Sequence, residues 1–379
     1  MRGLLIFYDY FTPAYKAGGP IRSLENLIHL LKGHFNIFVI TTNQDHGGET
    51  LEVVADEWIK RSDKVFVIHL SPENRTFINV KKLVSKIEFD GIYINGIFSP
   101  FTTIIPLKLG KRLNVPIWIA PRGMLQRGAL SIKPLKKKVY LFLLKFFLLR
   151  RNQVNWHATD EQEEQDILRF TGKMASIKVV GNIPSYDSTF LPVVKEMDCL
   201  KLVTISLIAP KKNHVFFLNV LKEIDTTHSV IYDIYGPVSD EEHLRSLQHL
   251  AKQLPSNIKV AFKPSVKPWE VNEILKSYHY FVLPTLGENF GHAIFEAFNV
   301  GLPVLISDQT PWKNLAGKSA GWDLALNEKT WIKTMNEVIK QGDEDYHTLQ
   351  AGARKVAEDY ISSENLRENY LTMFQTSNL

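Results

Sequence analysis

The sequence predicts two α/β domains of the doubly wound type, each built on a mainly parallel sheet. Short apolar runs recur along the whole chain, and segments with helical periodicity lie between them. This regular alternation is typical of parallel sheets covered by helices. A length of 379 residues is enough for two domains. A hydrophobic content of 45% with 22% charged residues is that of an ordinary globular chain, which can bury two cores.

The first half contains seven apolar runs that we predict to be strands. They lie at residues 3–10, 35–42, 65–70, 91–95, 116–120, 154–159 and 176–180. A helix is expected over residues 20–32, because Pro20 suits the first helical turn and follows a Gly18-Gly19 loop. We expect residues 1–183 to form the first domain, and the aperiodic residues 184–199 to link it to the second.

The second half repeats the alternation. Strands are predicted at residues 202–206, 230–235, 258–262, 280–283 and 304–306, and helices at 216–224, 268–277 and 291–299. The chain is mainly helical from residue 327 onward. We expect residues 200–361 to form the second domain, and residues 362–379 to form a last helix that packs back on the first.

Charge and cysteine content narrow the class of protein. A net charge of +5 is too small for a general nucleic-acid-binding field, so no nucleic-acid partner is expected. The single cysteine, Cys199, excludes an internal disulfide and fits a reducing compartment. The first apolar run ends at Asp9 without a cleavage-site pattern, so we expect a cytoplasmic protein.

The most basic and most apolar stretch of the chain is residues 133–151. Its apolar part is shorter than the roughly 20 residues of a membrane span. It is interpreted either as an amphipathic helix with a basic entrance at a membrane surface, or as a helix buried against the sheet with solvated lysines; the two are compatible. The lysines expected on this membrane or acceptor side are Lys136, Lys137, Lys138 and Lys145.

The most informative stretch is residues 280–308, which predicts a strand, a loop, a helix and a second strand. Its loop lies at the carboxyl end of the first strand, where open parallel sheets bind ligands. Glu288 in the loop and Glu296 in the helix have seven residues between them. A helix N-terminus attracts phosphate, and carboxylates suit sugar hydroxyl groups. Taken alone, Glu296 fits a ligand-binding role and an ordinary role, as a partner of the helix dipole or a solvated residue, equally well.

This stretch resembles the E-x7-E signature of the retaining glycosyltransferases of family 4, with its Phe-Gly, Glu-Ala and Gly-x-Pro-Val neighbours. The resemblance extends to residues 8–20, 121–125, 209–213, 234–237 and 307–312. It implies the GT-B fold, in which two Rossmann-like domains face a central cleft. Within this family, the sequence resembles those of bacterial enzymes that build capsule, lipopolysaccharide O-antigen or exopolysaccharide.

The resemblance also implies roles for the second half. Glu296 would accept hydrogen bonds from ribose hydroxyls and Glu288 would orient the transferred sugar. Lys212 would neutralise the diphosphate of a UDP- or GDP-sugar donor. The remaining donor-side residues expected by resemblance are Asn289, Phe290, Gly291 and His292 around the helix start, and Lys263 and Val266 along the nucleobase.

From the first half, Gly18 and Gly19 would approach the diphosphate across the cleft, and Arg122 would lie near the reacting sugar. The implied reaction is transfer of a sugar to a glycan that is carried on a lipid, with retention of configuration and without a metal or cofactor. The metal-type spacing Asp343-Glu-Asp345 is interpreted as a solvated loop.

Two other functions stay open. One is a nucleotide-sugar epimerase of similar architecture. The other is a catalytically weak subunit that binds a nucleotide sugar or scaffolds an assembly, because Leu207 stands where many relatives carry an arginine. A further hypothesis is that Arg122 supplies the positive charge that is missing at Leu207.

Overall fold

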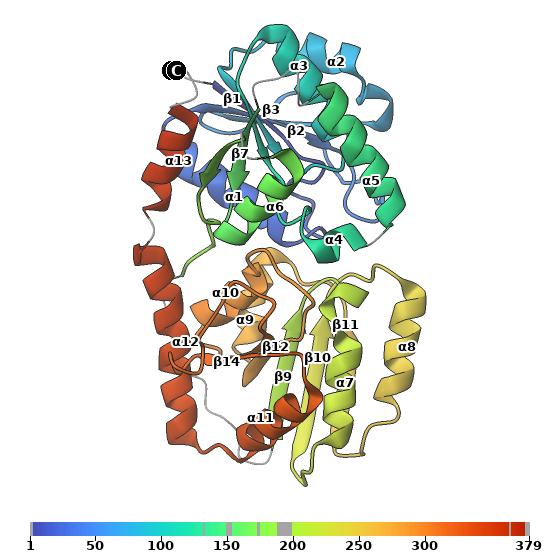
Figure 1. The fold of residues 1–379 in the computed structure, drawn as a ribbon, viewed down its shortest axis with the longest axis vertical. Helices are drawn as coiled ribbons and strands as arrows, with labels where there is room; N and C mark the ends of the chain where they lie inside the picture. The colour runs from blue at the N-terminus through green and yellow to red at the C-terminus, as the bar shows by residue number, and fades with distance from the viewer. Residues whose placement is uncertain are drawn as a thin grey trace. The chain divides into compact units, whose positions relative to one another are not determined.

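The computed structural model describes residues 3–131, 133–148, 154–172, 175–187, 199–363 and 365–375. The chain divides into two compact units, each with its own sheet and core. Unit 1 comprises residues 1–183 and 365–379, and unit 2 comprises residues 184–364. The predicted fold class is confirmed, since both units are α/β layers on a mainly parallel sheet (Figure 1).

Unit 1 contains a sheet of eight strands in the order β3-β4-β2-β1-β5-β6-β7-β8. All neighbours pair in parallel except β3 and β4. The strands are β1 (Gly3–Phe7), β2 (Asn36–Thr42), β3 (Ile59–Ser62), β4 (Val65–Leu70), β5 (Gly91–Asn95), β6 (Ile117–Ala120), β7 (Val154–Ala158) and β8 (Ser176–Val179). The central strands are buried on both faces, which is why each reads as a continuous apolar run.

The helices of unit 1 cover this sheet. They are α1 (Gly19–Leu31), α2 (Phe77–Val84), α3 (Ile105–Leu113), α4 (Arg127–Ser131), α5 (Pro134–Leu143), α6 (Glu161–Thr171) and α13 (Leu366–Gln375). Helix α13 comes from the far end of the sequence and packs beside α1, with the Phe374 ring 6.1 Å from the Phe35 ring. The last helix therefore belongs to the core of unit 1.

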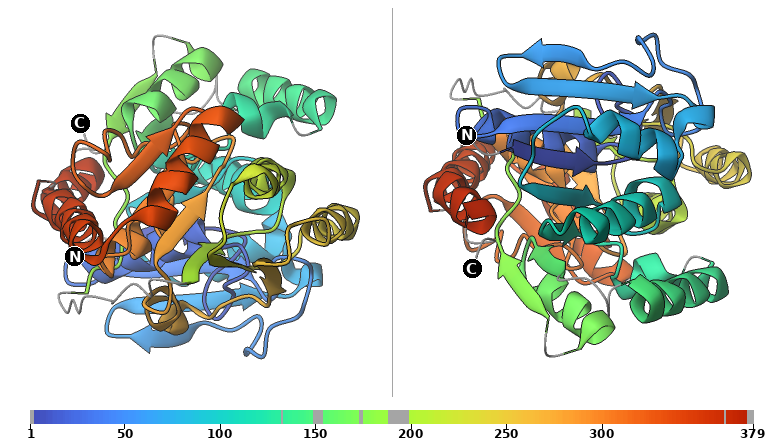
Figure 2. Two further views of the ribbon diagram at one scale, coloured as in Figure 1. Left: turned by 90° about the horizontal axis from the view of Figure 1, so that it is seen from below. Right: turned by 90° about the horizontal axis from the view of Figure 1, so that it is seen from above.

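Unit 2 contains a parallel sheet of six strands in the order β11-β10-β9-β12-β13-β14. The strands are β9 (Cys199–Ile205), β10 (Ser229–Tyr235), β11 (Ile258–Lys263), β12 (Tyr280–Leu283), β13 (Val304–Ser307) and β14 (Gly321–Leu324). The helices are α7 (His214–Glu223), α8 (Glu241–Ala251), α9 (Val271–Leu275), α10 (His292–Asn299), α11 (Glu328–Lys340) and α12 (Asp343–Ser363). Helices α7 and α8 lie side by side in both figures (Figures 1 and 2).

Several boundaries differ from the prediction. Strand β3 was not predicted because its residues, Ile-Lys-Arg-Ser, are polar and exposed; it is an antiparallel edge strand. Strand β14 was missed because it is short and begins with a glycine. The helix predicted over residues 268–277 is a 3₁₀ turn, Pro268–Glu270, followed by the short α9. Residues Asp343–Asp345 are not a loop but the first turn of α12, where carboxylates favour the helix dipole.

The first boundary between the units follows Ile183, and the second precedes Asn365. In unit 2, the buried Arg354 of α12 donates to the backbone carbonyl of Asp187 at 2.8 Å and to the Tyr186 hydroxyl at 2.7 Å. These residues of the predicted 184–199 linker are therefore fastened to unit 2. Residues 188–198 lie outside the described part of the chain, and Cys199 already belongs to β9.

Candidate functional site

The predicted donor loop of unit 2, residues 284–291, lies at the carboxyl edge of the sheet, between the loops that follow β9 and β13. The backbone N–H of Leu286 donates to the Lys211 carbonyl at 2.9 Å, and that of Glu288 donates to the Gln309 carbonyl at 2.9 Å. The Ser307 hydroxyl donates to the Thr285 carbonyl at 2.6 Å. Strand order alone brings these loops together, since β12 lies between β9 and β13.

Lys212 and Glu288 form an ion pair at this edge. Their side chains are 18% and 14% exposed, so the pair is reachable from solvent but mostly shielded. The Thr285 hydroxyl lies 3.3 Å from Glu288 Oε1 and helps to fix the carboxylate. Lys212 ends the 3₁₀ turn Pro210–Lys212, and the left-handed Asn213 (φ 58°) then starts α7. Two residues singled out by the sequence thus meet at one point.

Helix α10 begins at this loop without a side-chain cap. Its N-cap residue is Gly291, with φ 77° and ψ 64°, so the first turn presents backbone amides only. A helix start of this kind is suited to an anion. The ring of Phe290 is buried and 5.2 Å from the Trp312 ring, and the Phe290 carbonyl accepts a bond from Trp312 Nε1 at 2.6 Å. Phe290 therefore anchors the loop, with the His292 ring 4.8 Å away.

The conformation of Gly291 gives a stability prediction. A Cβ added there would lie 2.7 Å from Ile294 Cδ1, in a left-handed backbone. Gly291→Ala is therefore expected to lower the free energy of unfolding by about 1–2 kcal/mol. Urea unfolding would measure this, with Gly342→Ala as the control, since no atom lies within 4 Å of its added Cβ. Equal midpoints for the two variants would contradict the prediction.

Glu296 is the fifth residue of α10 and is 9% exposed. Lys263 ends β11, and its ammonium lies 3.9 Å from Asp233 Oδ2. Asp233 also accepts a 2.6 Å bond from the Tyr278 hydroxyl, and burial together with this bond raises the pKa of Tyr278. Val266 is partly buried and packs against the apolar core that includes residues of α10. Asp233 was not predicted as a site residue, although a single acidic residue within an apolar strand is a signal that could have indicated it.

A second residue that the sequence reading missed is His214, the first residue of α7. It is fully buried, and burial, with the Lys212 charge adding to the effect, lowers its pKa to about 3. Its Nδ1 lies 3.4 Å from the Tyr232 hydroxyl, which lies 2.8 Å from the Thr204 hydroxyl. These contacts link the start of α7, two residues after Lys212, to β10 and β9. No local pattern in the sequence identifies it.

In unit 1, Arg122 is 8% exposed, and three side chains hold its guanidinium group. Nε donates to Asn95 at 2.7 Å, Nη1 to Asn182 at 2.8 Å and Nη2 to the Tyr93 hydroxyl at 2.7 Å. The Tyr93 hydroxyl lies 2.8 Å from Nδ1 of His157, whose Nε2 lies 2.9 Å from the Val180 carbonyl. Arg122 itself has φ 55°, a conformation often found at functional sites.

Asp45 fixes the loop before Gly18 and Gly19 through hydrogen bonds to its backbone. This residue was not predicted from the sequence. Its carboxylate accepts bonds from the backbone N–H groups of Tyr15 at 3.0 Å and Lys16 at 3.2 Å. Gly18 is the N-cap of α1 with φ 72°, and no atom lies within 4 Å of where its Cβ would be. Its approach to a diphosphate stays a prediction.

Helix α5 and the π-helical turn Leu144–Leu148 contain the predicted membrane-side lysines, and α5 lies at the periphery of unit 1 (Figures 1 and 2). Lys136 and Lys138 are exposed. The ammonium groups of Lys137 and Lys145 instead donate to the carbonyls of Ala129 and Phe170, each at 2.6 Å. Residues 149–151 lie outside the described chain. Within the described ranges, no helix is both long and apolar enough to cross a bilayer.

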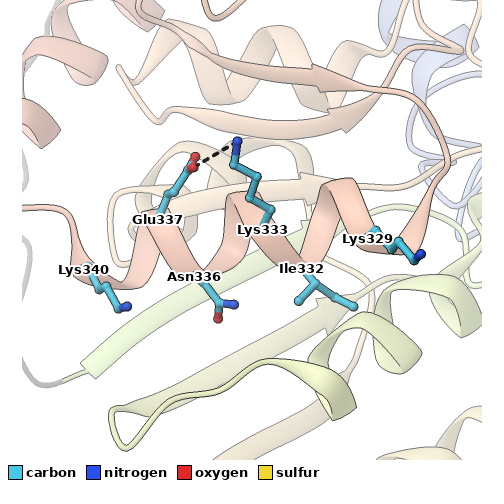
Figure 3. Close-up of a pocket in the computed structure, with 6 residues that line it drawn as sticks. All are labelled: Lys329, Ile332, Lys333, Asn336, Glu337 and Lys340. Carbon is cyan, nitrogen blue, oxygen red and sulfur yellow. Dashed lines mark ion pairs between the residues drawn. The ribbon is translucent and has the colours of Figure 1, made fainter.

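A separate pocket in unit 2 lies along α11 and contains none of the predicted donor-side residues (Figure 3). Its lining includes Lys333 and Glu337, whose charged groups are 3.8 Å apart.

A family model matches most of the second half of the chain. Residues 192–367 match the family model of the glycosyl transferases group 1. This segment, slightly less than half of the chain, is similar to a group 1 glycosyl transferase domain. No curated protein matches the chain.

Solved structures of the GT-B type share the fold of the whole chain. Sucrose-phosphate synthase from Thermosynechococcus elongatus superposes with a TM-score of 0.78 at 15% identity, covering 99% of this chain and 98% of that one. Anabaena HepE, in complex with UDP and glucose, gives 0.68 at 15% identity with full coverage of both chains. WaaG, a glycosyltransferase of lipopolysaccharide biosynthesis, gives 0.62 at 13% identity, covering 98% and 99%. The segment that matches the family model includes the donor loop, Lys212 and Lys263.

Proposed function

We propose that this protein is a retaining, metal-independent glycosyltransferase of family 4, which transfers a sugar from a UDP- or GDP-sugar to a glycan carried on a lipid. The observation that carries the proposal is the Lys212–Glu288 ion pair beside the uncapped start of α10, at the carboxyl edge of a group 1 domain. The complexes of Anabaena HepE with UDP and with UDP-glucose support the choice of donor class.

The chemistry follows from the charge of the leaving group. A departing nucleoside diphosphate gains negative charge, and groups already aimed at that charge lower the barrier. Lys212 supplies an ammonium group, and the first turn of α10 supplies backbone amides. Glu288 pairs with Lys212, and in the proposed reaction it contacts the transferred sugar. The leaving phosphate takes the proton of the acceptor hydroxyl, so no side chain is assigned as a base.

The test is thermal unfolding with UDP, GDP, ADP and CMP. A ligand that binds only the folded state raises the midpoint by mass action. We expect one diphosphate to raise the midpoint of the wild type, and Lys212→Ala to abolish that rise. Lys222→Ala, an exposed lysine of α7, is the matched control and should keep it. No rise with any nucleotide would contradict a donor site and would favour a scaffold role, for which Leu207 is the sequence signal.

An exposed apolar stripe on α5 supports a lipid-carried acceptor and attachment to the inner face of the cytoplasmic membrane. Leu135, Val139, Phe142 and Phe146 recur at helical spacing, and Leu135 and Phe142 are 76% and 66% exposed. Lys136 and Lys138 flank the stripe. The opposite face, with Leu141 and Leu144, is buried in the core. Such a helix suits the surface of an anionic membrane.

This proposal predicts vesicle binding. Replacing Leu135 and Phe142 by Gln is expected to weaken binding to phosphatidylglycerol vesicles by at least about tenfold, since burying one such side chain contributes about 1.5–3 kcal/mol. Co-sedimentation would measure it. Ile78→Gln is the matched control, because Ile78 is 78% exposed on α2 of the same unit. Equal binding by the double variant and the control would exclude the stripe as the membrane contact.

A further inference from the structure

A polar cluster in unit 1 lies where β1 and β5 end. Asp9 follows β1, and its Oδ1 accepts bonds from the Ser99 hydroxyl at 2.7 Å and the Thr102 hydroxyl at 3.1 Å, both from the segment after β5. The chain leaves β1 toward β2 on one side and returns as β5 on the other. This is the topological switch point of the sheet, where open α/β sheets bind ligands.

The cluster has hydrogen-bonding capacity that the protein does not use. Oδ2 of Asp9 accepts no hydrogen bond from the described residues, and the side chain is partly exposed. The hydroxyl groups of Thr103 and Tyr140, which act on each other, are buried beside this cluster. Buried polar groups are normally paired, so each exception calls for an explanation. A hydroxyl group of a ligand would pair Oδ2 of Asp9, which is the accessible acceptor of the cluster.

The raised pKa of Asp9 also supports a binding role for this residue. Burial raises the pKa of this carboxyl, although its bonds to Ser99 and Thr102 and the Arg75 charge act against the rise. The folded state then binds more protons than the unfolded state, between the ordinary pKa of an aspartate and the raised one. Stability therefore falls as pH rises through that window, and an ionised Asp9 costs stability at neutral pH. Acids held at such a cost are typical of functional sites.

Arg75 stands at the same edge of the sheet, after β4. It donates to the Leu70 carbonyl at 3.1 Å and to Asn43 at 2.9 Å. Its charge acts on Asp9, yet these two described residues form no ion pair. A carboxylate accepts hydrogen bonds and a guanidinium group donates them. The two together match the mixed donors and acceptors of a sugar ring.

The cluster also adjoins α5. The Tyr140 ring packs 5.6 Å from the Phe98 ring, the Lys137 ammonium lies 5.1 Å from that ring, and Phe98 immediately precedes Ser99. The charge of Asp9 contributes to the raised pKa of Tyr140, about 12, whose main cause is burial. The buried face of α5 therefore borders the cluster of Asp9, Ser99 and Thr102, and the exposed face of α5 carries the apolar stripe.

We propose that Asp9, with Arg75, binds a hydroxyl-bearing ring of the acceptor glycan at the β1–β5 switch point. Asp9 Oδ2 accepts a hydrogen bond from a ring hydroxyl, and the guanidinium group of Arg75 donates to a neighbouring oxygen. The inference rests on the proposed function, because it assigns the acceptor end of the same reaction. It is a binding role, and no proton transfer is assigned to Asp9.

The test is Asp9→Asn, which keeps an oxygen for Ser99 and Thr102 and replaces the unpaired oxygen by a donor. The probes are the octyl glycosides of glucose, galactose, mannose and N-acetylglucosamine, with binding followed by ligand-detected NMR. We expect the wild type to bind at least one, and Asp9→Asn to bind it at least about tenfold more weakly. The rise in midpoint with the donor nucleotide should be unchanged, and the midpoint without ligand at pH 7.5 should equal or exceed that of the wild type.

The matched control is Asp160→Asn. Asp160 caps α6 of the same unit, accepts the Glu163 N–H at 2.7 Å and also has its pKa raised by burial. Its replacement should leave glycoside binding intact. Equal binding by Asp9→Asn and wild type, no glycoside binding by the wild type, or a midpoint of Asp9→Asn well below wild type would each overturn the inference. Absence of a nucleotide effect in the wild type would instead count against the donor site, so the two failures are distinguishable.

Discussion

Lys212→Ala is expected to reduce the turnover of sugar transfer by about 10²–10³-fold, the usual cost of removing one group that stabilises developing negative charge. The variant loses the ammonium group that faces Glu288 at the donor edge. It also leaves the Glu288 carboxylate, 14% exposed, without that cation and close to the expected diphosphate. Two effects therefore add: lost stabilisation and new repulsion. Release of the nucleoside diphosphate would be measured with the nucleotide sugar that the wild type accepts.

The Lys212–Glu288 ion pair also predicts the direction in which a second substitution changes the affinity for the nucleotide. Glu288→Gln in the Lys212→Ala background should recover part of the lost affinity for the nucleotide, because it removes the repelling charge. Turnover should stay low, since the cation is still missing. A double-mutant cycle measures this coupling between contacting residues. Simple additivity of the two changes would show that the pair does not act as a unit at the donor site, and Lys222→Ala again serves as the matched control.

Arg122→Ala is expected to destabilise unit 1 by about 3 kcal/mol or more. The guanidinium group satisfies Asn95, Asn182 and the Tyr93 hydroxyl, and a buried polar group left without its partner costs about 1–3 kcal/mol. At roughly 2–4 °C per kcal/mol for a unit of this size, the unfolding midpoint should fall by about 6–12 °C. Thermal unfolding would measure this, with the exposed Arg112→Ala as the control.

The same variant separates two roles for Arg122. Arg122→Lys keeps the positive charge but cannot make all three bonds, so a structural role predicts a loss of stability there as well. A direct role on the donor predicts instead a variant of near-normal stability that has lost affinity and turnover. If Arg122→Ala leaves donor affinity and turnover intact, Arg122 does not compensate for Leu207. The burial of its guanidinium group favours the structural outcome.

The sequence predicted most strands because their signal is local. A strand buried on both faces must be continuously apolar, and β5, β6 and β12 are. Strand β3 carries no such signal, because its place at the sheet edge exposes all four residues. The same locality explains Asp343–Asp345, whose polar composition fits a loop and a first helical turn equally well.

The candidate site was predictable in part. The donor loop was found because its turn, helix start and acids lie within one short stretch, and Lys212 was found by resemblance. The ion pair between Lys212 and Glu288 was not predictable, because the two are separated by 76 positions and meet through the adjacency of β9 and β12. Asp233 and His214 were missed because their partners come from other strands and helices.

The sequence by itself determined the two α/β units, most of their strands and the donor loop. All of these follow from short-range periodicity and from the positions of glycine and proline residues. The tertiary structure decided what the charged residues do. It buried Arg122 among partners 27 to 60 positions away and set Asp9 against Ser99 and Thr102 across about 90 positions. The physical reason is that strand order, which no local pattern encodes, decides which strand ends share an edge. The chemistry of this protein is expected at those shared edges.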